Sequence, residues 1–191
     1  MSDVDTTVSE HRELEMELES KKRTLFDVLR NSDHEVVEEY ELLRLTGESV
    51  MLGELFGDRE DLIVVHNMGR DCPYCTMWAD GFDGLHEHLV DRAAFVVCSP
   101  DAQTVQRDFA CDRDWSFVMV SSHESSFTED MGFASEASYQ LGVSSFHRDS
   151  DGSITRIASR WFGPYDDYFP VWNLFGMMKD GPDGWEPQYD Y

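Results

Sequence analysis

The sequence predicts an α/β protein in which helices flank a mixed central β-sheet. Two continuous apolar runs, residues 62–66 and 93–98, are rich in β-branched side chains, which is typical of strands buried on both faces. A segment that can be helical follows each run, and this β-α-β-α order indicates parallel strands. The turn sequence at residues 149–152 separates two further strand-like segments and predicts an antiparallel hairpin.

The chain is expected to begin with a helical arm. Over residues 9–30, apolar side chains recur at helical spacing among glutamate, arginine and lysine. The leucines of this stripe are Leu14, Leu18, Leu25 and Leu29. The pattern predicts an amphipathic helix, solvated over most of its surface, whose one buried stripe packs on a domain or on a partner.

The other elements follow in chain order. Further helices are expected at residues 73–89, 102–110 and 171–179. Further strands are expected at residues 40–45, 49–52, 115–120, 143–148 and 153–161, the first two joined by a tight turn at Gly47. We therefore predict three parts: a helical arm at residues 1–35, one α/β domain at residues 36–179 and an irregular tail at residues 180–191.

The composition limits the partners that the chain can have. The 39 acidic and 15 basic residues give a formal net charge of −24, which makes nucleic acids and anionic membranes poor partners. The acids are dispersed and only three residues are lysines, which together predict a halophilic, acidic protein of a high-salt cytosol. An acidic surface built for a basic partner is the alternative. No apolar run is long enough to span a membrane and no secretory signal is visible, so we expect a cytoplasmic protein.

Two of the four cysteines form a Cys-x-x-Cys motif, Cys72-Pro73-Tyr74-Cys75, where the first apolar strand gives way to a helix. A proline at the first helical position suits that boundary. The unpaired amides and the dipole at a helix N-terminus stabilise a thiolate, so an exposed Cys72 is expected to attack a disulfide. Cys75 would then resolve the mixed disulfide.

Residues 62–85 read LIVVHNMGRDCPYCTMWADGFDGL and resemble the signature of a thioredoxin-like family of predicted dithiol-disulfide oxidoreductases, long catalogued as a domain of unknown function. Weaker similarity continues through much of the chain from about residue 36. The resemblance implies a thioredoxin-like fold and dithiol-disulfide exchange without a cofactor. Catalysis would fall to Cys72 and Cys75, supported by Pro73, Tyr74, Arg70, Trp78 and Asp80.

The sequence also departs from related patterns. The strand that should begin near residues 142–146 lacks the proline that thioredoxins hold in the cis form opposite the active disulfide. The Pro-x-x-x-Thr-x-x-Cys pattern of peroxiredoxins does not precede Cys72. The glutathione-site features of glutaredoxins are missing downstream.

Several neighbours of the motif have a structural interpretation beside the functional one. Arg70 and Asp71 oppose each other in their effect on the Cys72 thiolate. Trp78 is expected to pack in the core or at its rim. Asp80 is expected either to relay a proton to Cys75 or to belong to a helix-ending turn. Of the other candidates, His66 is expected as a satisfied strand histidine, and Cys98 and Cys111 as small buried apolar residues.

Two alternatives to an oxidoreductase remain open. Cys72 and Cys75 could hold zinc or copper together with His66, Cys98 or a histidine of the pair His86 and His88. The chain could also be a non-catalytic thioredoxin-like scaffold. For the leading hypothesis we expect a disulfide-containing protein or a small thiol as substrate, a separate electron donor, and a homo-oligomer as one candidate assembly.

Overall fold

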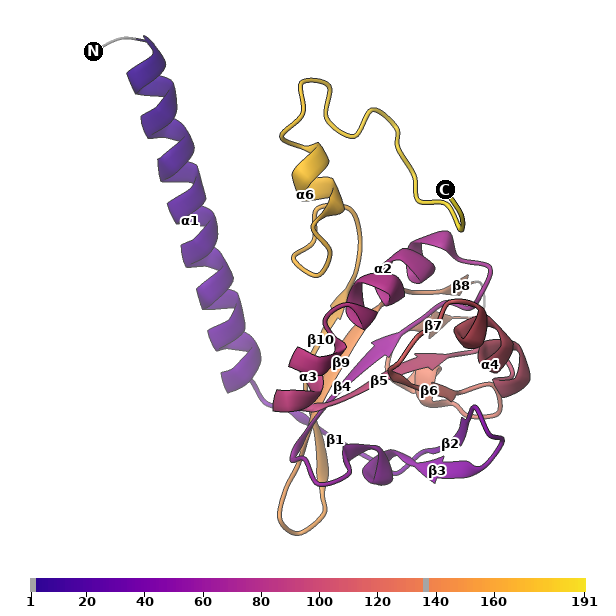
Figure 1. Ribbon diagram of the computed structural model, residues 1–191. Helices are drawn as coiled ribbons and strands as arrows, with labels where there is room; N and C mark the ends of the chain where they lie inside the picture. The colour runs from indigo at the N-terminus through magenta and orange to yellow at the C-terminus, as the bar shows by residue number, and fades with distance from the viewer. Residues whose placement is uncertain (1–2, 136–137) are drawn as a thin grey trace. The chain divides into compact units, whose positions relative to one another are not determined.

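The computed structural model describes residues 3–135 and 138–191 (Figure 1). The chain divides into two compact units, Met1–His34 and Glu35–Tyr191. The first unit contains one helix, α1 (Asp3–Asn31), which confirms the helix expected at residues 9–30. No described helix is both long and apolar enough to cross a membrane.

The second unit is built on a mixed sheet, as predicted. Among the described residues the sheet has eight strands in the order β1-β10-β9-β4-β5-β6-β2-β3. Strands β4, β5 and β6 are parallel, and the other neighbours pair antiparallel. Their bounds are β1 (Glu35–Val37), β2 (Glu41–Arg44), β3 (Ser49–Met51), β4 (Asp61–His66), β5 (Ala94–Ser99), β6 (Val118–Ser121), β9 (Gly142–Arg148) and β10 (Ile154–Trp161). Strands β7 (Ala134–Ser135) and β8 (Ser138–Tyr139) pair antiparallel in a separate two-stranded sheet.

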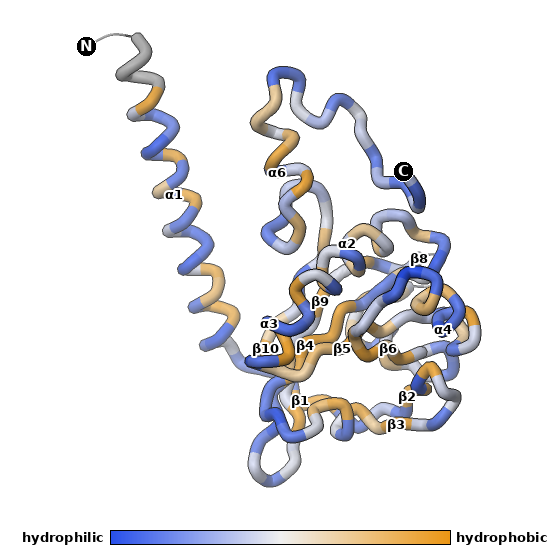
Figure 2. The backbone as a smooth tube through the Cα atoms, viewed as in Figure 1, coloured by the Kyte–Doolittle hydropathy of each residue, from blue (hydrophilic) through white to orange (hydrophobic). Residues whose placement is uncertain are grey.

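Apolar side chains are buried on both faces of this sheet. Along β4 and β5, Val64 and Val96 belong to the buried group on one face, and Val65 and Val97 to the group on the other. Figure 2 shows these central strands as hydrophobic. Side chains alternate between the faces of a strand, so a continuous apolar run supplies both cores at once.

The remaining elements are short helices. They are the 3-10 helix η1 (Leu52–Phe56) and the α-helices α2 (Pro73–Asp83), α3 (His86–Arg92), α4 (Gln103–Asp112), α5 (Phe127–Asp130) and α6 (Val171–Phe175). The sequence pattern did not predict η1, α5, β1, β7 or β8. Each has five residues or fewer, which is too short to show a helical or a strand period.

The prediction of one helix at residues 73–89 is wrong, because α2 ends at Asp83 and α3 begins at His86. Gly84, a poor helix former, lies at the break. The Asp83 carboxylate also accepts hydrogen bonds from the backbone N–H and hydroxyl of Ser116, at 2.7 and 2.8 Å, which anchors the end of α2.

Two other predicted elements are shorter than expected. The strand predicted at residues 115–120 begins only at Val118, since the Ser116 backbone N–H bonds to α2 instead of a neighbouring strand. The helix predicted at residues 171–179 ends at Phe175, followed by Gly176 and turns. Residues 180–191 contain no helix or strand.

Candidate active site

The Cys-x-x-Cys motif lies at the carboxyl end of β4, where the chain turns into α2. Gly69 takes a positive φ of 111° in this turn, and its backbone N–H donates to the Asn67 side chain at 2.7 Å. Cys72 is the N-cap of α2 and Pro73 occupies its first turn. The local sequence thus places the first sulfur at a helix N-terminus, where backbone N–H groups lack helical partners.

The Cys72 sulfur accepts hydrogen bonds that favour its thiolate. The Cys75 backbone N–H donates to Cys72 Sγ at 3.1 Å. The hydrogen bond from the Cys75 thiol holds the pKa of Cys72 below its ordinary value, and the backbone N–H groups of Cys75 and Tyr74 act in the same direction, while burial opposes them. These hydrogen bonds favour ionisation of Cys72, and the thiolate is the reactive form of a cysteine.

Cys75 lies one helical turn further into the protein. Cys75 is 1% exposed. Burial raises the pKa of its thiol, and the neighbouring Cys72 raises it further. Its sulfur accepts the Met68 backbone N–H at 3.3 Å. Both cysteines are free thiols. Cys72 is itself only 7% exposed, so the expectation of an exposed first sulfur is wrong.

Arg70 and Asp71 precede the motif, and their charges are engaged with each other. Arg70 Nε lies 3.6 Å from Asp71 Oδ1, and the Arg70 backbone N–H donates to the Asp101 carboxylate at 2.7 Å. The Asp71 side chain is almost fully exposed. The pairing supports the expectation that the two charges offset each other near Cys72.

Aromatic rings from the C-terminal part of the chain cover α2. Trp78 is 1% exposed and stacks on Trp172 of α6 with ring centroids 5.2 Å apart. Tyr74, inside the motif, stacks on the same Trp172 at 5.7 Å. Phe162 also stacks on Trp78, with ring centroids 6.0 Å apart. Trp78 thus packs in the core as expected, whereas the part played by Phe162 could not be predicted because it depends on a contact far along the chain.

Asp80 does not lie in a helix-ending turn. Among the described contacts, no hydrogen bond joins its side chain to Cys75. Helix α2 continues past it to Asp83. Its carboxylate forms an ion pair with Arg113 and accepts the Trp115 indole N–H at 2.8 Å. Asp80 therefore ties α2 to the segment that follows α4.

The C-terminal tail reaches the same region, which the sequence did not indicate. Arg113 donates to the Tyr189 carbonyl at 2.7 Å, and Pro187 is buried. In Figure 1 the chain end lies beside the loop that leads into α2. Burial raises the pKa of Tyr189, and the charges of Asp71, Cys72 and Cys75 add to the shift. Tyr189 is thus within electrostatic range of both thiols.

The metal ligands proposed from the sequence are not brought together. His66 stacks on Phe133 with centroids 3.9 Å apart, on the face of the sheet that holds Val64 and Cys98 and not the face that holds Cys72 and Cys75. Among the side chains that the structure describes, no group of three or more His, Cys, Asp or Glu is arranged to hold a metal ion.

The structure agrees with some of the expectations for His66, Cys98 and Cys111 and contradicts others. His66 Nε2 lies 3.0 Å from the Ser144 hydroxyl, whereas its buried Nδ1 has no described partner. Cys98 is buried as predicted, and burial raises the pKa of its thiol to about 11. Cys111 is exposed, so the prediction that it is a buried apolar residue is wrong.

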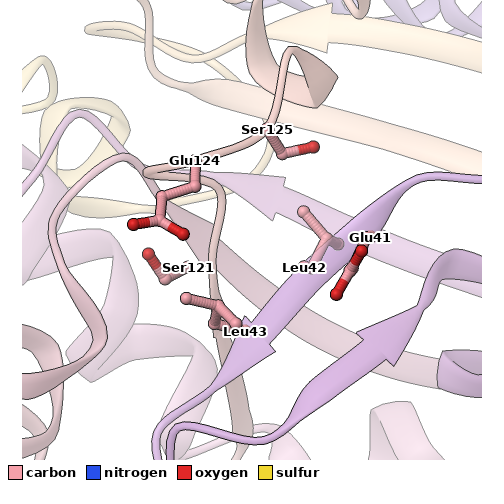
Figure 3. A pocket seen from close by; sticks show the side chains of 6 residues that line it. All are labelled: Glu41, Leu42, Leu43, Ser121, Glu124 and Ser125. Carbon is pink, nitrogen blue, oxygen red and sulfur yellow. The ribbon is translucent and has the colours of Figure 1, made fainter.

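A surface pocket of about 130 Å³ lies between β2 and the segment that follows β6 (Figure 3). The six described residues that line it include two carboxylates, Glu41 and Glu124, and no thiol. Negative charge makes this pocket unsuitable for an anionic ligand. None of the residues that line this pocket belongs to the cysteine motif.

Comparison with known proteins identifies the family. The family described as "Bacterial protein of unknown function (DUF899)" matches residues 10–187. The chain belongs to this family. A search of curated proteins gave no match. The resemblance to a thioredoxin-like family once catalogued as a domain of unknown function is therefore confirmed, while a high-salt version of it stays a prediction.

Solved structures similar to this DUF899 member share its fold. Peroxidoxin BcpB from Mycobacterium tuberculosis is 22% identical, with a TM-score of 0.53 over 63% of this chain and 80% of that one. A reduced 2-Cys peroxiredoxin from Plasmodium vivax is 12% identical, with a TM-score of 0.53 over 68% and 85%. A PrxQ mutant from Xylella fastidiosa is 12% identical, with a TM-score of 0.52 over 69% and 87%. These likenesses confirm the predicted thioredoxin-like fold.

Proposed function

We propose that this chain is a dithiol-disulfide oxidoreductase in which Cys72 attacks and Cys75 resolves. The observation that carries the proposal is the difference between the two sulfurs. Cys72 accepts the Cys75 backbone N–H and has a lowered pKa, whereas Cys75 is buried and has a raised pKa. A disulfide-exchange pair needs one sulfur that is ionised first and a second that attacks only afterwards.

The reaction transfers two electrons from the dithiol to the substrate. The Cys72 thiolate attacks one sulfur of the substrate disulfide, forms a mixed disulfide and releases the other sulfur as a thiolate. Cys75 then attacks Cys72 Sγ, its proton passing to a substrate thiolate, so that the Cys72–Cys75 disulfide forms and the second substrate thiol leaves. A thiol reductant from outside the chain restores the dithiol for another turnover.

Disulfide exchange is favoured over peroxide reduction on the residues present. Structures named peroxiredoxins share this fold, which supports thiol redox chemistry on it. However, the residues before Cys72 lack the Pro-x-x-x-Thr-x-x-Cys pattern. The start of β9, at Gly142, also lacks the proline that thioredoxins would lead us to expect there. We therefore expect substrate binding to differ from that of thioredoxins.

The test is a reduction assay with insulin, a small aromatic disulfide and hydrogen peroxide as separate substrates. We expect the wild-type protein to reduce disulfides and Cys72→Ser to lose that activity. Cys75→Ser should accumulate a mixed disulfide through Cys72, seen by mass spectrometry. Cys111→Ser is the matched control and should retain activity, because Cys111 lies outside the motif.

Four outcomes would overturn the proposal. Full disulfide reduction by Cys72→Ser would exclude the attacking role of Cys72. Activity toward peroxide alone would assign a different reaction to the same thiols. One zinc or copper ion per purified chain, lost on substitution of Cys72 and Cys75, would favour the metal-binding alternative. Inactivity in every assay, with no metal bound, would favour the scaffold.

A further inference from the structure

Helix α1 carries an apolar stripe and forms a compact unit by itself. Along this stripe, Leu14, Leu18 and Leu25 are 64%, 54% and 38% exposed. Figure 2 shows hydrophobic residues recurring along α1 among hydrophilic ones. A single helix cannot bury its own stripe, and exposed apolar side chains that line up on one face indicate an interaction surface.

The leucines of this stripe are arranged symmetrically. Leu14, Leu18, Leu25 and Leu29 are separated by four, seven and four residues. A twofold axis passing between residues 21 and 22 therefore places Leu14 opposite Leu29, and Leu18 opposite Leu25, of a second antiparallel copy. Leu14 and Leu25, like Leu18 and Leu29, are eleven residues apart, which is about three helical turns and keeps all four leucines on one stripe. A twofold axis is the usual symmetry of a homodimer.

The charges of α1 favour the same arrangement. Residues 10–19 contain five glutamates and one arginine, whereas residues 20–30 contain four lysines or arginines and one aspartate. Antiparallel pairing places the acidic half of each helix beside the basic half of the other, for example Glu13 opposite Arg30. Parallel pairing would place like charges side by side, which is destabilising.

Lys21 and Lys22 lie at the proposed axis. Lys21 is already paired with Glu17 of its own helix at 2.7 Å. Long lysine side chains can cover apolar surface while their charged ends stay in water. A lysine at one core position of a coiled coil lowers its stability but selects its register. Antiparallel pairing places Lys21 of one copy near Lys22 of the other, and the Glu17 carboxylate beside Lys21 offsets part of this like-charge repulsion.

We propose that α1 is a dimerisation helix that binds α1 of a second copy of this chain. The pair forms an antiparallel, two-stranded coiled coil with the four leucines at its seam. This inference does not depend on the redox chemistry proposed for residues 72–75, and either can fail without the other.

The first test is the mass of the full chain in solution, measured by light scattering over a range of concentrations. We expect a dimer of the 22.0 kDa chain. Leu18→Asp combined with Leu25→Asp should give a monomer. The control combines Met16→Asp with Ser20→Asp, which adds the same charge on the opposite face of α1 and should leave the dimer intact. Tryptophan fluorescence should not change in either variant, because all five tryptophans follow residue 34.

The second test determines the orientation of the two helices. Lys22→Cys places a thiol beside the proposed axis, so mild oxidation should link two copies through residue 22, as identified by mass spectrometry of the linked peptides. His11→Cys places a thiol on the same stripe but far from the axis and should not link to itself. Linkage at both positions would indicate parallel helices and overturn the proposal. So would a monomeric wild-type chain, or a dimer that survives the two leucine substitutions.

Discussion

At the scale of single residues, burial separates side chains that the sequence presents as equivalent. Cys72 and Cys75 are both cysteines of one motif, yet Cys72 caps α2 and accepts the Cys75 backbone N–H, whereas Cys75 is buried inside the helix. Burial also changes the ionisation of His66, which has no part in the proposed chemistry. It is 1% exposed, and burial lowers its pKa to about 3, with the charge of Arg156 adding to the shift. A histidine in the unfolded chain titrates near pH 6.5.

His66 should therefore make the protein sensitive to acid. Between pH 6.5 and 3 the unfolded chain binds a proton at His66 and the folded chain does not. The resulting stability is fully present above pH 6.5 and is lost as the pH falls, by about 1.4 kcal/mol per pH unit.

We predict that His66→Gln lowers stability at pH 7, because the contact with Ser144 is altered, but flattens the decline in stability below pH 6.5. Urea unfolding at several pH values measures both effects. His88→Gln, at an exposed position, is the control and should keep the wild-type slope. An unchanged slope in His66→Gln would show that this histidine does not remain neutral in the folded protein.

At the scale of elements, the start of β9 is a place where two strands approach closely. A Cβ at Gly142 would lie 2.3 Å from the Arg160 carbonyl oxygen and 2.4 Å from the Phe133 ring. The chain thus has a glycine where a side chain would meet backbone. Close packing of β9 against β10 explains why no larger residue is present.

We predict that Gly142→Ala destabilises the protein by about 1–3 kcal/mol, the usual cost of overpacking. Gly163→Ala is the matched control, since nothing lies within 4 Å of its Cβ position. Its free energy of unfolding should change by no more than about 0.5 kcal/mol. Chemical denaturation of both variants measures the difference, and equal stabilities would contradict the packing argument.

The C-terminal tail is a second element whose role depends on contact with others. The Arg113 side chain donates to the Tyr189 carbonyl, and Arg113 also pairs with Asp80 of α2.

We predict that Tyr189→Ala increases the rate at which iodoacetamide alkylates Cys72, because the tail lies near both thiols. Asp190→Ala, at a side chain that is 98% exposed, is the control and should leave the rate unchanged. An equal rate in both variants would show that Tyr189 does not limit access to Cys72.

At the scale of the whole molecule, charge is the dominant feature. A formal net charge of −24 on 191 residues implies strong self-repulsion unless salt screens it. The Debye length is about 3 Å at 1 M salt and about 10 Å at 0.1 M. Folding should therefore weaken as the salt concentration falls.

We predict that the melting temperature falls markedly between molar salt and about 0.1 M salt. Thermal melts followed by circular dichroism measure this change. An uncharged osmolyte at matched osmolarity is the control and should not replace salt fully, because it does not screen charge. A melting temperature independent of salt would contradict the prediction of a halophilic protein.

The sequence by itself determined the features that depend on neighbouring residues. The apolar runs at residues 62–66 and 93–98 predicted the central parallel strands, since burial on both faces requires continuous apolar side chains. The helical period predicted α1, and turn residues predicted the hairpin of β9 and β10. The order of strand, Cys72 and Pro73 placed the candidate nucleophile at a helix N-terminus.

Tertiary structure alone decided how these parts meet. Cys72 is buried in the folded chain. The stacking of Trp172 on Tyr74 and the approach of Tyr189 to the motif each join segments about 100 residues apart in the sequence. At the break between α2 and α3, where Gly84 lies, the contact of Ser116 with Asp83 comes from beyond α4 and could not be read from the local sequence. The physical reason is that a local pattern specifies which face of an element is apolar, whereas burial and pKa depend on which distant side chains cover that face.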